Sequence, residues 1–525
     1  MLSKAADMGK VSARSSFHLF WGLILSTIIS SVGTIIIGNL LTDADMGLYY
    51  IALQAPLLIQ LFRDWGVGAA MIKYTALYNS ENNFGKVKAI IISGLAFQTI
   101  LGLLLNVFTF AIAGFLAGSI YDRPGIESMI QVSSFILLAG ALTSSAQAVF
   151  VGLERMFYNS VSMVVQAVVK TLLMTVLVVV GFGVLGAVLG NVVSLMISGL
   201  IGVMLIYLIY KNFPHVGSWS VQFFENIKLM LKYGVPLSVG SIVGGFLLQF
   251  YNIVLANFVS DALIGNYSIA NTFVVLISFF SIPVATMLFP AFSKLDAKKN
   301  KEDLRSVFGF SVRYGSLLVV PVAMLVMVLS RPAVYALFGD KFPSTPLFLA
   351  LLAVPYLFSA FGSLSVGNLL NSQGETRLHM KFILLNAAIA FPLSYVLISQ
   401  LQVVGLILTT IIAPIPTLII SRYWIWKHYG LTIDWVFSAK ILFSSAIPAL
   451  VAYLAISFFV SYWIQLIVGV IVFVLVFLVA AILTKTIKRS DIENLKDMTL
   501  SLGPLHKMII FFMSLVERMM NLFDL

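Results

Sequence analysis

The sequence predicts an all-α membrane protein with about fourteen transmembrane helices. Two six-helix bundles, related by an internal duplication with pseudo-twofold symmetry, are expected to be followed by two additional helices. The 525 residues are 60% hydrophobic and only 10% charged, whereas about 25% of the residues in a soluble domain are charged. Apolar stretches long enough to cross a bilayer follow one another along the chain, and two segments of the first half recur in the second half.

The apolar stretches predict helices rather than the strands of a barrel. A helix needs about 20 apolar residues to cross roughly 30 Å of hydrocarbon, whereas a barrel strand has about 10 residues and alternates apolar with polar side chains. The stretches here are long and do not alternate. The predicted spans are residues 19–41, 47–70, 89–117, 129–153, 161–180, 184–210, 235–259, 265–289, 307–329, 346–370, 380–398, 403–420, 439–460 and 464–482.

Lysine and arginine residues predict the orientation of the chain. With the N-terminus inside the cell, the cytoplasmic segments hold 26 of the 32 lysines and arginines, and the outer loops hold only Arg123, Arg331 and Lys341. Positive residues concentrate on the cytoplasmic side of membrane proteins. We therefore expect a multi-pass protein of the plasma membrane with both termini in the cytoplasm. The net charge of +11 would then face anionic lipid headgroups rather than nucleic acid.

Two hairpins of the first half recur in the second half. GNLLTDADMGLYYIA at residues 38–52 and ANFVSDALIGNYSIA at residues 256–270 are identical at seven of fifteen positions, at a shift of 218. Gly186 in GVLGAVLG corresponds to Gly405 in QVVGLILT, at a shift of 219. Because each copy holds an even number of spans, both copies keep the same orientation, as in transporters built from parallel repeats.

The duplication predicts how the chain is divided. The predicted parts are an N-terminal six-helix bundle at residues 1–210, a cytoplasmic linker at 211–234, a second six-helix bundle at 235–430, two additional transmembrane helices at 431–484, and a cytoplasmic or interfacial tail at 485–525. The linker is expected to form a short helix on the inner surface, and the apolar segment 505–523 is expected to lie at the interface because it carries charges near both ends.

The residue types disfavour several kinds of chemistry. The chain has no cysteine, which rules out disulfides and thiol catalysis. It has no GxxxxGK[ST] phosphate loop, and its five histidines do not pair at metal-ligand spacing. No loop is long enough to fold into an enzyme domain. We therefore expect a transporter rather than an enzyme, with no cofactor and no metal.

Charges inside the spans are the strongest functional candidates, because a buried charge in a membrane is costly unless it is paired or hydrated. Lys170 lies near the middle of span 161–180, and Gln166 precedes it by one helical turn. Arg63 and Asp64 lie in the inner third of span 47–70. Lys170 is interpreted either as a cationic site for an anionic substrate or as the structural partner of Asp64.

Other polar residues are weaker candidates. Arg313 lies near the inner end of span 307–329, where it either contacts substrate or reaches a lipid headgroup. Gln249 and Asn252 lie in span 235–259, where they either join neighbouring helices or contact sugar hydroxyls. The predicted substrate-binding residues are Arg63, Asp64, Gln166, Lys170, Gln249, Asn252 and Arg313.

Two segments suggest a family. LTDADMGLYYIALQAPLLIQLFRDWGVGAAMIKYTA resembles the opening of polysaccharide transporters of the O-antigen flippase type, with a Gly-x-Tyr entering the second span and a later charged, glycine-containing segment. FGVLGAVLGNVVSLMISGLIGVMLIYLIYK is similar to spans 5 and 6 of that family. The resemblance covers roughly residues 10–430. The family belongs to a superfamily with multidrug and toxin extruders and the lipid II flippase.

The resemblance implies a multidrug-extruder-like fold of two bundles around a central cavity, working by alternating access. It implies that a polyprenyl phosphate- or pyrophosphate-linked oligosaccharide is moved from the inner to the outer leaflet for surface glycan biosynthesis. Cationic cavity residues are a theme of the family, which Arg63 and Lys170 fit. The expected partners are this lipid, membrane lipids and enzymes of glycan biosynthesis, and the chain is expected to be a monomer.

Two other functions stay open at this point. A cation-coupled multidrug extruder of the same superfamily needs acidic groups deep in its cavity, and Asp64 is the clear candidate. A membrane-embedded glycosyltransferase needs paired carboxylates. The nearest pair is Asp43 and Asp45, of which only Asp43 recurs in the second copy of the hairpin.

Overall fold

The computed structural model describes residues 2–211, 222–293, 295, 301–487, 514 and 517. These residues are almost entirely helical and form no strand. Contacts group the chain into two compact units, Met1–Gly265 and Asn266–Leu525. Part of the predicted linker (residues 212–221) and nearly all of the predicted interfacial tail lie outside the described residues.

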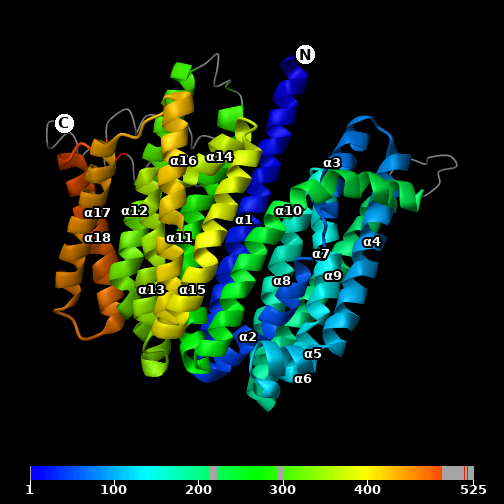
Figure 1. The fold of residues 1–525 in the computed structure, drawn as a ribbon, viewed down its shortest axis with the longest axis horizontal. Helices are drawn as coiled ribbons and strands as arrows, with labels where there is room; N and C mark the ends of the chain where they lie inside the picture. Colours follow the sequence, from blue (N-terminus) through cyan, green and yellow to red (C-terminus); the bar gives the residue numbers. More distant parts are fainter. Residues whose placement is uncertain are drawn as a thin grey trace. The chain divides into compact units, whose positions relative to one another are not determined.

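Unit 1 is a bundle of long helices connected by short turns (Figure 1). In this bundle α1 packs on α8, α8 packs on α9, and α7 lies between α9 and α4. The last helix, α10, packs against α2, α3 and α4. The elements are α1 (Leu2–Leu40), α2 (Asp43–Gln60), α3 (Val67–Ser80), α4 (Phe84–Ala111), α5 (Ala113–Phe115), η1 (Leu116–Ile120), η2 (Pro124–Ile126), α6 (Glu127–Ser133), α7 (Phe135–Gly152), α8 (Met156–Leu177), η3 (Val178–Phe182), α9 (Gly183–Lys211) and α10 (Phe223–Phe258).

Unit 2 contains most of α11 and all later helices. In this unit α12 is central, since it packs on α13, η5, α17 and α18, and the last two helices lie side by side (Figure 1). The elements are α11 (Asp261–Ser293), α12 (Lys301–Phe338), η4 (Gly339–Lys341), α13 (Thr345–Ala353), η5 (Val354–Phe361), α14 (Ser363–Ser372), α15 (Thr376–Ile412), α16 (Pro414–Tyr429), α17 (Trp435–Ile456) and α18 (Tyr462–Leu483). The predicted division into two six-helix bundles stays a prediction.

The described helices have the length and composition of membrane spans. Nine are long and apolar enough to cross a membrane, or up to eleven if each of two bent pairs is one span. Two of the nine, Met156–Lys211 and Thr376–Tyr429, have 56 and 54 residues and contain sharp breaks at Gly181 and Gln402. The predicted all-helical, multi-pass membrane fold is confirmed, and the count of fourteen is consistent with these spans.

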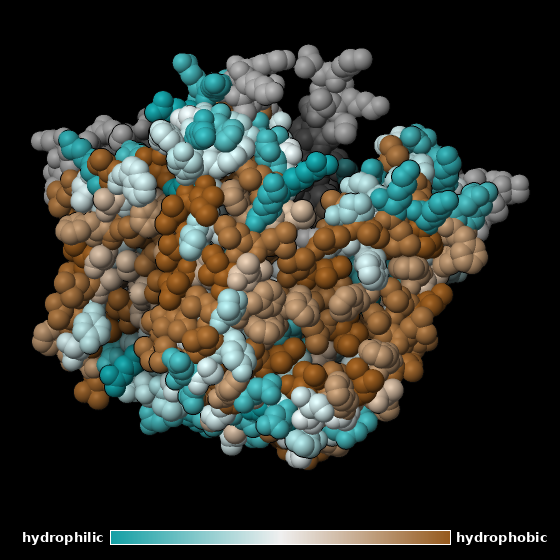
Figure 2. All heavy atoms as spheres, viewed as in Figure 1, coloured by the Kyte–Doolittle hydropathy of each residue, from teal (hydrophilic) through white to brown (hydrophobic). Residues whose placement is uncertain are grey.

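The surface supports the same conclusion. Figure 2 shows hydrophobic side chains along the middle of the helices and hydrophilic side chains toward their ends. Large apolar side chains such as Val179, Leu248 and Leu450 are at least 60% exposed. Exposure on this scale is unfavourable in water but not in hydrocarbon.

At least two predicted spans are not single helices. Span 346–370 is divided into α13, η5 and α14, with a bend of 56°, and span 47–70 is also interrupted. Residues 61–66 leave helical geometry between α2 and α3, so the prediction of one helix at 47–70 was wrong. Hydropathy alone did not reveal the break, because the apolar residues continue on both sides of it. The start of α2 is also defined locally: Thr42 and Asp45 form a capping box, which gives Asp45 a structural role.

The repeated glycines lie where two backbones approach closely. A Cβ added to Gly47 would overlap the carbonyl oxygen of Asp261, and a Cβ added to Gly265 would overlap that of Asp43. The two copies of the repeated hairpin therefore contact each other reciprocally, within unit 1.

The second repeated glycine has the same role in both halves. A Cβ on Gly186 would lie 3.0 Å from the carbonyl carbon of Leu177, and one on Gly405 would overlap the carbonyl oxygen of Leu397. Each glycine thus packs on the helix that precedes it across a chain reversal.

We expect Gly47→Ala to destabilise the protein by about 1–3 kcal/mol, because the methyl group forces apart two backbones that cannot yield like a flexible side chain. The measurement is the thermal unfolding midpoint of the purified protein in detergent. Gly118→Ala is the matched control, since nothing lies within 4 Å of its added Cβ. Equal midpoints for the Gly47 variant and the wild type would contradict the packing role.

Candidate functional site

The break between α2 and α3 is the centre of the candidate site. Trp65 and Gly66 adopt positive φ angles of 48° and 75°, a region that favours glycine. The backbone of Gly66 packs directly on the backbone of Gly234 in α10, with no room for a Cβ on either residue. Non-helical backbone at membrane depth is tolerated only inside protein or along a water-filled cavity, so α10 is part of what makes the break possible.

Asp64 holds the start of α3 in place. Its Oδ1 accepts hydrogen bonds from the backbone N–H of Gly68 at 2.9 Å and from Nε2 of Gln98 in α4 at 2.8 Å. Gln98 in turn accepts a hydrogen bond from the hydroxyl of Ser144 in α7 at 3.0 Å. A carboxylate at a helix N-terminus also interacts favourably with the helix dipole. Asp64 therefore joins α3 and α4, and through Gln98 it is connected to α7.

Arg63 is buried beside this network without adequate partners. Its side chain is 6% exposed and lies against Gly140 of α7, whose added Cβ would be 3.2 Å from Nη1. Nε and Nη1 are buried and have no hydrogen-bond partner among the described residues. A buried cation without partners is costly. Two of the three guanidinium nitrogens of Arg63 thus keep hydrogen-bonding capacity that the described residues do not use.

Lys170 and Gln166 lie in α8, which packs between α1 and α9. Among the described residues, Lys170 forms no hydrogen bond or ion pair, and the described part of the chain contains a single ion pair elsewhere. The alternative in which Asp64 neutralises Lys170 is therefore not realised, because the contacts of Asp64 are with Gly68 and Gln98. No hydrogen bond or ion pair joins Lys170 to Arg63 either.

Asn252 connects α10 to α2, with Gln249 beside it in α10. The Nδ2 of Asn252 donates to Oε1 of Gln54 at 2.8 Å and to Oε1 of Gln249 at 3.4 Å, and the hydroxyl of Tyr50 donates to Oδ1 of Asn252 at 3.1 Å. These contacts favour the helix-joining interpretation of Asn252, whereas the hydrogen bond of Gln249 is to Asn252 in its own helix. They hold α10 against the helix that leads into the Arg63 break.

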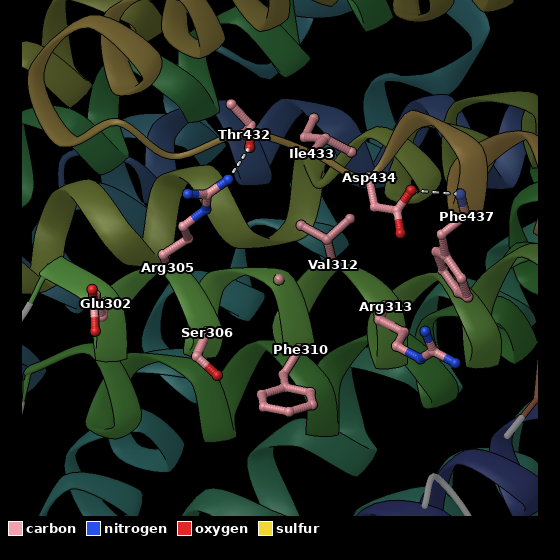
Figure 3. Close-up of a pocket in the computed structure, with 11 residues that line it drawn as sticks. Glu302, Arg305, Ser306, Phe310, Val312, Arg313, Thr432, Ile433, Asp434 and Phe437 are labelled. Carbon is pink, nitrogen blue, oxygen red and sulfur yellow. Dashed lines mark hydrogen bonds between the residues drawn. The ribbon is translucent and has the colours of Figure 1, made fainter. Parts of the chain in front are cut away.

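Arg313 lies in unit 2, in the wall of a cavity of about 510 Å³ (Figure 3). Its Nη2 donates to the carbonyl oxygen of Thr486 at 3.0 Å, and its guanidinium carbon lies 4.8 Å from the ring centre of Phe437. These contacts tie α12 to α17 and to the chain that follows α18. The predicted site residues thus form several separate groups. Asn252 and Gln249 are joined by a hydrogen bond, and Arg63 and Asp64 are neighbours in the chain.

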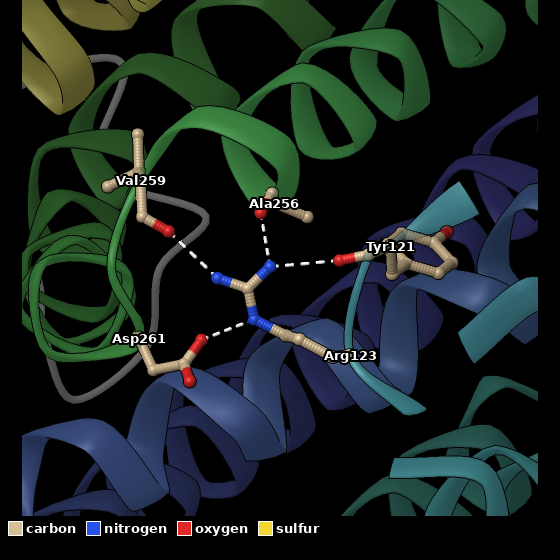
Figure 4. Close-up of polar contacts among 5 residues, drawn as sticks. All are labelled: Tyr121, Arg123, Ala256, Val259 and Asp261. Atoms are coloured by element: carbon tan, nitrogen blue, oxygen red, sulfur yellow. Dashed lines mark hydrogen bonds and ion pairs between the residues drawn. The ribbon is translucent and has the colours of Figure 1, made fainter. Parts of the chain in front are cut away.

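Arg123 forms a cluster that sequence reasoning missed. The residue follows η1 and binds the α10–α11 junction: it contacts the carboxylate of Asp261 and the carbonyl of Ala256, and donates to the carbonyl of Val259 at 2.8 Å (Figure 4). Its Nη1 also donates to the carbonyl of Tyr121 at 2.9 Å. The only signals in the sequence were that Arg123 is one of three outer basic residues and that Asp261 recurs in the repeat.

Comparisons with known families cover nearly the whole chain. A family model described as polysaccharide biosynthesis protein matches residues 12–296, and a model of the lipid II flippase MurJ matches residues 245–477. An uncharacterised membrane protein of Methanocaldococcus jannaschii is 23% identical over 83% of this chain and 88% of its own length.

Two further relatives match over shorter regions. The probable low-salt glycan biosynthesis flippase Agl15 of Haloferax volcanii is 23% identical over 41% of this chain and 48% of its own length. The lipopolysaccharide biosynthesis protein WzxC of Escherichia coli is 29% identical over 29% of this chain and 30% of its own length.

Solved structures with the same fold include two kinds of transporter. The lipid II flippase MurJ in an inward closed conformation has a TM-score of 0.68 at 15% identity, covering 89% of this chain and 98% of that chain. An inward-facing multidrug transporter of the MATE family has a TM-score of 0.62 at 15% identity, covering 77% and 94%. Since the first family model matches more than half of its residues, the chain belongs to the polysaccharide biosynthesis protein family of multi-pass membrane proteins.

Proposed function

We propose that the protein is a flippase that moves a glycan carried on a polyprenyl phosphate or pyrophosphate from the inner to the outer leaflet. The observation that carries the proposal is Arg63, a buried guanidinium with unpartnered nitrogens at a break between two helices. Family membership supports it, as do two relatives whose names refer to a glycan flippase and to lipopolysaccharide biosynthesis.

The physical role of Arg63 in this proposal is to replace water around a phosphate. A phosphate cannot enter hydrocarbon without losing its hydration, and a guanidinium offers several N–H donors in a geometry that matches phosphate oxygens. Lys170 supplies a second positive charge, with Gln166 on the same face of α8. The lipid tail stays in the bilayer, so the protein needs to carry only the polar headgroup, and no covalent bond is made or broken.

Transport in this proposal proceeds by alternating access. The Arg123 cluster, on the predicted outer side, holds the α10–α11 junction against the segment between η1 and η2. Opening the outer side would break an ion pair and two hydrogen bonds to backbone carbonyls. We call these Arg123 contacts the latch. They favour the state that is closed on the outside until substrate binding compensates for the loss of these contacts.

We expect Arg63→Gln to reduce export of the surface glycan about 10- to 100-fold, because a hydrogen-bonded charge contributes about 1.5–3 kcal/mol to binding. Lys170→Met should act in the same direction. The measurement is surface glycan in cells whose only copy of the gene encodes the variant, with protein abundance in the membrane as a reference. Removal of an unpaired buried charge should leave the fold intact.

Arg155→Gln is the matched control for Arg63, because Arg155 is an exposed arginine of the same unit. It should export at the wild-type level. If the Arg63 and Lys170 variants both export normally, the cationic site does not exist.

We expect Arg123→Gln to open the outer side. A cysteine placed at Ala256 should then react several-fold faster with a membrane-impermeant maleimide. The side chain of Ala256 is only 2% exposed while the Arg123 contacts are in place. The chain contains no native cysteine, so labelling reports on this position alone. Arg331→Gln serves as the control, and equal labelling of the Arg123 variant and the wild type would remove the latch from the mechanism.

A cation-coupled multidrug extruder is the second candidate, and Asp64 is the observation that favours it. Its carboxylate lies beside the break and is partly buried, bonded to Gln98. In the flippase we expect Asp64→Asn to keep most glycan export, because the asparagine oxygen can still accept the hydrogen bonds from Gly68 and Gln98. Loss of proton- or sodium-driven drug efflux in this variant, with glycan export unchanged, would instead favour the extruder.

A further inference from the structure

Arg422 is a second buried arginine without partners, and none of the roles above uses it. It lies in α16 of unit 2, beside Val312 of α12 and Gly362, where the chain turns into α14. Gly362 has a φ of 67°, and its added Cβ would be 3.3 Å from Nη2 of Arg422. Nε, Nη1 and Nη2 are all buried and have no hydrogen-bond partner among the described residues.

This arrangement is costly unless an anion completes it. A guanidinium has five N–H donors and stays charged in proteins. Arg313 of α12 shows the satisfied alternative, since it has a carbonyl and an aromatic ring as partners. Arg422 has neither, and the described residues around it supply no carboxylate in an ion pair.

Arg422 lines a cavity of about 310 Å³ at the junction of α16 and α17. It is the sole charged residue in the lining, which otherwise consists of Phe308, Tyr423, Ile425, Trp426, Leu431, Thr432, Ile433 and Trp435. No acidic side chain is present to compensate the arginine. The cavity is therefore positive in charge and largely apolar in surface.

A second arginine stands at the edge of this cavity. The Nη2 of Arg305 donates to the hydroxyl of Thr432 at 3.4 Å (Figure 3), and Thr432 belongs to the lining. Arg305 is exposed. An anionic group that enters past Thr432 would thus meet Arg305 at the edge of the cavity and Arg422 in its lining.

The aromatic residues of the lining point to a lipid. Tyr423, Trp426 and Trp435 are 57%, 55% and 64% exposed, and tryptophan and tyrosine are enriched where a membrane protein meets the headgroup level. Arg422 lies seven residues before the end of α16 at Tyr429, or about 10 Å along the helix. That depth is within reach of a phosphate at the predicted inner surface.

We propose that this cavity binds the phosphate-bearing headgroup of an anionic membrane phospholipid, with Arg422 as the principal cation. The guanidinium nitrogens are buried, with Nη2 next to Gly362, so in this proposal the side chain turns into the cavity when the phosphate enters. The aromatic rings contact the glycerol and upper acyl region. Basic pockets between membrane helices on the cytoplasmic side bind anionic lipid headgroups elsewhere. The site is separate from Arg63 and does not depend on the proposed transport function.

The test is native mass spectrometry of the full-length protein, released from detergent after incubation with phosphatidylglycerol. We expect Arg422→Gln to retain about tenfold less phosphatidylglycerol than the wild type at equal lipid concentration, as loss of one charge-assisted contact implies. Arg377→Gln is the matched control, because Arg377 is an exposed arginine on the same predicted side, and it should retain lipid like the wild type.

Thr432→Trp keeps the test decisive if Arg422→Gln does not fold. Thr432 is exposed, so the larger side chain should fill the mouth of the cavity without disturbing the core, and lipid retention should again fall. Wild-type retention by the Arg422 or Thr432 variant would overturn the proposal. Equal retention of phosphatidylcholine by the wild type would also overturn it, as would full displacement of phosphatidylglycerol by millimolar inorganic phosphate, which would identify a site for the free anion.

Discussion

Hydrocarbon offers no hydrogen bonds, so each backbone N–H and C=O at membrane depth needs a partner within the protein. That constraint accounts for the helical character of the described chain, and it gives the break at residues 61–66 its significance. The break persists because Asp64 accepts the N–H of Gly68 and because Gly66 packs on the backbone of Gly234. Asn252 of α10 then bonds Gln54 and Tyr50 of α2, the helix that leads into the break. The candidate site is thus a consequence of how the protein supports an interrupted helix.

The arginines show how one residue type acquires different roles from its surroundings. Arg123 is fully engaged by a carboxylate and backbone carbonyls, and it connects elements more than 130 residues apart. Arg313 has a carbonyl and an aromatic ring. Arg63 and Arg422 are left with buried, unpartnered nitrogens. The first two are satisfied by groups of the chain itself, whereas the last two carry the proposed anion-binding sites.

The duplication repeats the packing of the chain but not its charges. Gly47 and Gly265 contact the carbonyls of each other's hairpins, and Gly186 and Gly405 both lie at chain reversals. The position that corresponds to Arg63 is Ser281, whose hydroxyl bonds the carbonyl of Ser278 in its own helix. Close backbone contacts tolerate no side chain, so they persist in both copies. Charged positions meet no such steric requirement, which leaves the two halves free to differ in chemistry.

The sequence by itself determined the fold class, the membrane spans in outline and the repeated hairpins. It also identified Arg63, Asp64 and Lys170 as charged residues deep within predicted spans. Hydropathy, repeat spacing and charge can all be read from the order of the residues alone. Only the tertiary structure decided that Asp64 binds Gln98 rather than Lys170, that Asn252 joins two helices, and that Arg123 reaches Asp261. It also decided that Arg422, which in sequence is one more basic residue at an inner helix end, has a buried guanidinium without partners. The energy of a buried polar group depends on which atoms surround it, and those atoms come from helices that are distant in the chain.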